Sequence, residues 1–135
     1  MGKKETAKKL TLTDLLARKT QGTADKLSYK DVYVEQLGGS ITLKKIPLNQ
    51  MLDMMDSVAD DASLKDSLAY EAELIYECCP MLHDKGLLEA YECVEPTDIV
   101  FRLLNDDIGA IGALAAEVLD FFGMGDSVRE QLKNS

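Results

Sequence analysis

The sequence predicts a mainly α protein of the α+β class: a compact helical domain with one β-hairpin near the N-terminus and a flexible helical arm before it. Two observations carry this prediction. Apolar residues recur at helical spacing through most of the chain after residue 47. The only convincing alternating pattern lies between residues 30 and 46, around a pair of glycines. Because 135 residues suit a single core, we expect an arm and linker at 1–27 and one globular domain at 28–135.

The arm contains a short amphipathic helix. Thr11 or Thr13 can cap this helix, and its apolar face holds Leu12, Leu15 and Leu16. Residues 20–28 hold turn formers without an apolar period, which is typical of a linker. Such an arm could pack on another subunit, so its three leucines are candidate residues for self-association.

Residues 30–46 have the pattern of a two-stranded hairpin. Gly38 and Gly39 can supply the positive φ angles of a tight turn between its strands. A lone hairpin is marginal in water, so its apolar face must lie on helices or join strands of another copy. The apolar positions that alternate along the strands are Val32, Val34, Ile41 and Leu43.

Two helices are expected next. Pro47 suits the first position of a helix with one apolar stripe, and Ser63 with Asp66 resembles a capping box that starts another helix ending before Pro80. The first stripe consists of Leu48, Met51, Leu52, Met55 and Val58, and the second of Leu64, Leu68, Ala72, Ile75 and Cys79.

The last third of the chain predicts further helical segments, each with its own start or stop signal. These signals are Asp84 and Pro96 for two short helices, Asn105 or Asp106 with Gly123 for a longer helix, and the stretch from Asp126 to Leu132 for a last amphipathic turn or two.

Charge is distributed unevenly along the chain. The net charge is −9, yet residues 1–26 hold seven Lys and Arg against three Asp and Glu, which is +4 and leaves −13 on the remainder. A field of that sign repels phosphate backbones and anionic lipid, so we expect no nucleic acid and no membrane partner. A basic or amphipathic protein partner fits better, although the charge could also serve solubility alone. The sequence has no apolar run long enough for a membrane span and no signal peptide, so we expect a cytoplasmic protein.

The cysteines and the single histidine do not predict a metal site. Three cysteines, two of them adjacent, favour reduced and mostly buried thiols over a disulfide framework. Cys78, Cys79, His83 and Cys93 include soft metal ligands, but adjacent helical residues point about 100° apart and the usual C-x2-C spacing is absent. We therefore expect neither a metal nor another cofactor.

Motifs for catalysis are also missing. The chain has one histidine, no Gly-x-Ser-x-Gly turn, and no glycine-rich turn between a strand and a helix. Its many carboxylates recur on faces expected to be solvated. The sequence therefore predicts a protein that is not an enzyme.

Two clusters could bind a partner. Met51, Met54, Met55 and Val58 either fill the core or form an adaptable groove for an apolar helix of a partner. A run of small residues on the longest helix serves either tight internal packing or self-association, because small residues let helices approach closely. This run consists of Gly109, Gly112, Ala113 and Ala116.

Four segments also carry a resemblance to a known family. They are LTDLLARK at 12–19, LGGSITLKK at 37–45, LIYECCPML at 74–82 and LLEAYECVEPTDIV at 87–100. Together, and in this order, they resemble the XkdN-like phage tail assembly chaperones. After residue 104 only the helical character is similar.

The resemblance implies a function in the cytoplasm of a bacterial host. A protein of this family would hold the tape measure protein of a contractile-tail phage, prophage or phage-tail-like particle soluble until tail tube subunits polymerise around it. The tape measure protein, and the tail tube protein as a further partner, would then be its targets, and the chaperone would be absent from the mature particle. The resemblance implies no catalytic residues. The alternative function is that of a small acidic regulatory adaptor or inhibitor that binds another protein.

Overall fold

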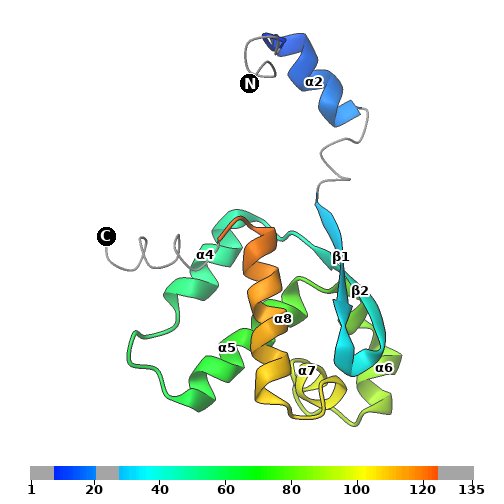
Figure 1. Cartoon of the computed structure of the whole chain (residues 1–135), viewed down its shortest axis with the longest axis vertical. Coiled ribbons are helices and arrows are strands. Elements are labelled where there is room, and N and C mark those ends of the chain that lie inside the picture. Colours follow the sequence, from blue (N-terminus) through cyan, green and yellow to red (C-terminus); the bar gives the residue numbers. More distant parts are fainter. Residues whose placement is uncertain (1–7, 21–27, 125–135) are drawn as a thin grey trace.

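The structure, a computed structural model, describes residues 8–20 and 28–124 and confirms the mainly α class (Figure 1). Within these ranges six α-helices and two short 3₁₀ helices accompany one antiparallel hairpin. The elements are α2 (Leu12–Thr20), β1 (Tyr29–Val34), η1 (Glu35–Leu37), β2 (Gly39–Lys44), α4 (Leu48–Asp56), α5 (Leu64–Glu77), η2 (Pro80–His83), α6 (Lys85–Ala90), α7 (Asp98–Leu103) and α8 (Ile108–Phe121).

The hairpin forms where the alternating pattern predicts it. Its register runs from Tyr29 opposite Lys44 to Val34 opposite Gly39. The turn differs from the prediction, because η1 makes most of the reversal and only Gly38 has a positive φ, at 66°. The prediction of a positive φ at Gly39 was wrong: that residue already belongs to β2. One left-handed residue after a 3₁₀ turn is enough to lead the chain into the second strand.

Helices α4 and α5 follow with small shifts. Pro47 is the last residue before α4 and has an extended ψ of 138°, so it precedes the helix instead of occupying its first position. The Ser63 hydroxyl accepts a hydrogen bond from the Asp66 N–H at 3.1 Å, which confirms the predicted cap of α5. Leu64, which was placed in the apolar stripe, is 64% exposed because it lies in the first turn, before the buried face of α5 begins.

The start of α8 corrects the sequence prediction. Asn105 and Asp106 have φ angles of 55° and 56°, and the Asp106 N–H donates to the Phe101 carbonyl at 2.8 Å. These two residues therefore end α7 in left-handed conformations, and neither caps α8. Asp107 is the cap, since its carboxylate accepts from the Ala110 N–H at 3.0 Å.

The C-terminal end of α8 agrees with the prediction. Gly123 follows this helix with a φ of 79°, a left-handed conformation that glycine adopts at little cost. The amphipathic turn predicted from Asp126 to Leu132 lies outside the described residues.

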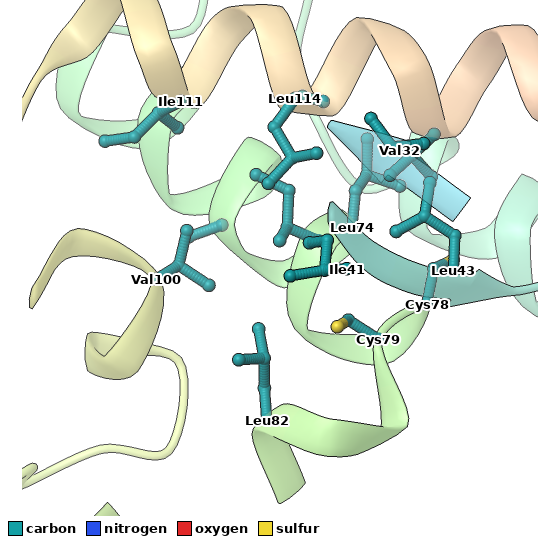
Figure 2. Close-up of a cluster of buried hydrophobic side chains, with 14 of the residues drawn as sticks. Val32, Ile41, Leu43, Leu74, Cys78, Cys79, Leu82, Val100, Ile111 and Leu114 are labelled. Atoms are coloured by element: carbon teal, nitrogen blue, oxygen red, sulfur yellow. The ribbon is translucent and has the colours of Figure 1, made fainter. Parts of the chain in front are cut away.

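The core lies where α8 crosses α5 and the hairpin covers one side of the pair (Figure 1). Figure 2 shows side chains from the hairpin, α5, η2, α7 and α8 converging on this centre. No buried residue in the described part of the chain is polar or charged. The Lys44 N–H donates to the Cys78 carbonyl at 2.7 Å, which joins the outer edge of β2 to the end of α5. Fully or almost fully buried members of this core are Leu43, Leu74, Ile75, Ile99, Ile111 and Val118.

None of the helices in the described ranges is both long and apolar enough to cross a membrane.

Candidate protein-binding groove

A groove of about 460 Å³ lies between α8 on one side and β1 with η1 on the other. It is bordered by small or apolar residues along most of its length and by carboxylates at intervals. The residues that line it are Val32, Tyr33, Val34, Glu35, Gln36, Asp107, Gly109, Ala110, Ala113, Leu114 and Glu117.

The strand wall of the groove is an edge of the sheet. The side chains of Val32 and Val34 point into the core and are each 7% exposed, while Tyr33 between them is 65% exposed. The Lys44 N–H points away from β1 and donates to Cys78, so Lys44 and Tyr29, the residue opposite it, form a pair without hydrogen bonds between the strands. The backbone polar groups of Tyr29, and of the alternate residues Asp31 and Tyr33, therefore point away from β2. The sheet in the described residues has two strands only, so no third strand pairs with this edge.

The helical wall of the groove carries two of the four small residues that the sequence singled out. Gly109 and Ala113 line the groove and are exposed. Ala116 is exposed but lies outside it, and Gly112 is partly buried near the carboxylate of Glu71. Tight internal packing is therefore not the role of Gly109, Ala113 or Ala116. The self-association hypothesis for these residues stays a prediction.

Polar contacts close the groove at both ends. At one end the Gln36 Nε2 donates to the Asp107 Oδ2 at 3.1 Å, and the Asn105 Nδ2 donates to the Gln36 Oε1 at 3.3 Å. At the other end the Lys30 Nζ lies 3.5 Å from the Glu117 Oε2, in an ion pair whose two side chains are about 40% exposed. These contacts link β1 and η1 to α8 across the groove.

The charged residues that line the groove are all acidic, namely Glu35, Asp107 and Glu117. Lys30 offsets part of the charge of Glu117. The groove thus combines a floor of small and apolar residues with a negative rim. This combination suits an apolar helix face with basic residues beside it.

Helix α2 has such a face. Leu12, Leu15 and Leu16 are 73%, 52% and 64% exposed. Thr11 caps this helix, as one of the two predicted candidates: the Asp14 N–H donates to the Thr11 Oγ1 at 3.2 Å, and the Thr11 N–H donates back to the Asp14 Oδ2 at 2.9 Å. The three leucines therefore form an apolar stripe on a well-capped helix.

The carboxylate of Asp14 is part of this cap. The Thr11 N–H, the Lys8 ammonium at 3.0 Å and the Thr11 hydroxyl hold the pKa of Asp14 below its usual value. Asp14 thus stays ionised at neutral pH, where its charge favours the N-terminus of the helix.

The methionine cluster does not form an open groove. Met51 is fully buried and Met54 is 7% exposed, so both belong to the core. Met54 is not a member of the apolar stripe predicted for this helix, but α4 packs on α5 and buries a wider arc than that stripe. Met55 packs partly buried against the core, and Val58 lies partly buried beyond the end of α4. Binding of a partner at these four residues would require α4 to move, and it stays a prediction.

The cysteines and His83 occupy separate environments. Cys78 and Cys79 are free thiols buried in the core, and Cys93 is a free, partly buried thiol. Burial raises the pKa of Cys78 to about 12, and the nearby Glu77 carboxylate adds to this shift. The His83 Nε2 donates to the Tyr76 carbonyl at 2.7 Å, and the two rings lie 4.3 Å apart. Residues 8–20 and 28–124 contain no group of three His, Cys, Asp or Glu side chains arranged to hold a metal.

The thiol of Cys78 leads to a pH-dependent prediction. In the unfolded chain a cysteine begins to lose its proton near pH 8.5, whereas in the folded protein the pKa of Cys78 is about 12. Between these two pKa values the unfolded state binds fewer protons than the folded state, so the free energy of unfolding falls as the pH rises. Below the pKa of the unfolded chain, the contribution of Cys78 to the free energy of unfolding is fully retained. We expect the difference in unfolding free energy between the native chain and Cys78→Ala to fall by about 1 kcal/mol per pH unit between about pH 9 and 10.

Urea titrations of both proteins across that pH range measure this difference. A difference that stays constant with pH would contradict the prediction.

No family model, no curated protein and no solved structure matches this chain.

Proposed function

We propose that the protein is a phage tail assembly chaperone that binds the tape measure protein and keeps it soluble until the tail tube polymerises. The observation that carries the proposal is the groove between β1 and α8, which combines a small, apolar floor with an acidic rim. The resemblance of four sequence segments to the XkdN-like family supplies the identity of the partner. The activity requires contact surfaces only, and no side chain takes part in catalysis.

The mechanism follows from the chemistry of the partner. A tape measure protein is long and largely helical, and the apolar faces of such helices aggregate before assembly unless something covers them. The groove would receive one apolar helix face, with Gly109 and Ala113 allowing a close approach. The charge of −13 on the chain after residue 26 would then keep the complex soluble. Polymerising tube subunits would displace the chaperone by covering the same helix faces.

Co-expression with the tape measure protein tests the function. We expect the native chain to raise the fraction of tape measure protein that stays in the supernatant after centrifugation. Ala113→Trp places a large side chain on the groove wall and should lower the affinity of the complex about fivefold or more, because losing a central contact typically costs over 1 kcal/mol. Ala69→Trp is the matched control, since Ala69 is also an exposed alanine within a fourteen-residue helix, α5.

Three results would oppose the proposal. Tape measure protein that is equally insoluble with and without this chain would contradict the chaperone function. Equal loss of binding with Ala113→Trp and Ala69→Trp would contradict the groove as the binding surface. Capture of an enzyme or transcription factor in place of the tape measure protein would favour a regulatory adaptor or inhibitor.

A further inference from the structure

We propose that the groove between β1 and α8 also receives helix α2 of a second copy of this chain, so that two copies exchange their N-terminal arms. The proposal concerns the isolated protein and does not depend on the identity of its partner. Three properties of the described residues support it: the size of the helix, the spacing of its leucines, and the opposite charges of helix and groove.

Helix and groove match in length. The nine residues of α2 span about 13 Å at 1.5 Å per residue. The lining residues of α8 extend from Asp107 to Glu117, about 15 Å at the same rise. A single helix of the length of α2 therefore fills the groove from one polar end to the other.

Helix and groove also match in side-chain size and spacing. Leu12 and Leu16 lie four residues apart on α2, and Gly109 and Ala113 lie four residues apart on α8. Residues with this separation stand one above the other on one face of a helix. Large leucine side chains can thus pack against small residues at equal intervals, which allows the close approach of two helices.

The charges are complementary. Lys9, Arg18 and Lys19 are exposed on the arm, while the charged residues lining the groove are acidic. Arg18 and Lys19 lie in the last turn of α2, and Lys9 precedes its first turn, so positive charge is present at both ends of the helix. The acidic residues likewise occur at both ends of the groove, with Asp107 at one end and Glu117 at the other, where Lys30 offsets part of the charge of Glu117. This arrangement attracts the arm and favours its alignment along the groove.

The structure favours a second copy as the source of the helix. Figure 1 shows α2 standing clear of the helical body of its own chain, and Leu12 is 73% exposed there. Each copy has one such arm and one such groove. Two copies related by a two-fold axis can fill both grooves and bury both leucine stripes, which closes the assembly at a dimer.

Light scattering after size-exclusion chromatography of the native chain, over a range of concentrations, tests the exchange. We expect a dimer that dissociates on dilution and is weakened by added salt, because part of the attraction is between exposed charges. Leu15→Glu on the arm and Ala113→Lys on the groove should each raise the dissociation constant of the dimer about tenfold or more. The first variant loses a buried leucine contact, and the second places a positive charge opposite the basic arm.

The matched controls are Ala17→Glu and Ala69→Lys. Ala17 lies on the side of α2 opposite the leucines, and Ala69 is an exposed alanine of α5. Both controls should dimerise as the native chain does. A native chain that stays monomeric at every concentration, or a dimer equally stable in all four variants, would overturn the proposal.

Disulfide trapping separates exchange between copies from docking within one chain. A tagged Leu12→Cys chain is mixed with an untagged Ala113→Cys chain, both carrying Cys93→Ser to remove the partly buried native thiol. Exchange predicts a heterodimer band on oxidation. If this mixture gives no heterodimer while the Leu12→Cys/Ala113→Cys double variant closes a disulfide within one chain, the arm docks on its own groove and the proposal fails. Tape measure solubility is not measured in either experiment, so failure of one proposal is distinguishable from failure of the other.

Discussion

Replacing Leu74 by alanine should lower the free energy of unfolding by about 3–4 kcal/mol. Leu74 is fully buried in the last turn of α5 and is drawn among the converging core side chains in Figure 2. Truncation of such a leucine removes its transfer free energy and leaves a cavity, because the neighbouring helix and hairpin can relax only partly. Urea denaturation followed by circular dichroism measures the change, with an unchanged m-value as evidence that the unfolded state is unaffected.

Leu64→Ala is the control for this substitution. Leu64 lies in the first turn of the same helix and is 64% exposed. Its replacement should change the free energy of unfolding by no more than about 0.5 kcal/mol, as is usual for a surface substitution. Equal losses at the two positions would mean that α5 does not bury the face described here.

Leu43→Ala should be nearly as costly, about 2–4 kcal/mol, and it should loosen the contact between the hairpin and α5. Leu43 is fully buried, and the next residue, Lys44, donates its N–H to the Cys78 carbonyl. A two-stranded hairpin has little stability of its own, so it depends on such contacts with the helices. Hydrogen exchange at the Lys44 amide should therefore become about a hundredfold faster, which corresponds to a loss of about 3 kcal/mol.

Leu37→Ala tests whether burial is responsible. Leu37 belongs to the same hairpin, in η1, but is 40% exposed. Its truncation should leave exchange at the Lys44 amide within about threefold of the native rate, since surface changes typically cost under 0.5 kcal/mol. A loss of less than 1 kcal/mol in Leu43→Ala would show that the hairpin is held by other contacts.

Much of the fold was predictable because its signals are local. Ser63 and Asp84 cap their helices through hydrogen bonds to residues three positions ahead, and such caps can be read from residue type and spacing. The two strands of the hairpin also follow from the alternation of apolar residues, but their register does not, because η1 makes the turn in place of a tight turn at the two glycines. The start of α8 could not be read in this way, because three consecutive residues, Asn105, Asp106 and Asp107, are all good caps. Their roles depend on how α7 ends, which is a matter of backbone geometry.

The groove itself was not predicted, although part of its wall was. The small residues of α8 were recognised as unusual, yet sequence alone gave them two alternative roles, and the choice depends on which face of α8 meets α5. Tyr33 and Gln36 carry no local signal for a groove, because their position opposite α8 results from packing between segments about 70 residues apart. Met54 was left out of the predicted apolar stripe for the same reason, because burial by a neighbouring helix does not appear in the periodicity of one helix.

The packing of α5 against α8 has a consequence for synthesis on the ribosome. The apolar face of α5 is complete once residue 77 has been added, but the helix that covers it ends at residue 121. At translation rates of about 5–20 residues per second, the interval between the two is about 2–9 s, and emergence from the exit tunnel delays both. During that interval the apolar face of α5 that α8 later covers is exposed on the nascent chain. Slow codons or a premature stop between residues 77 and 121 should therefore expose this face to proteases and to holdases of the host.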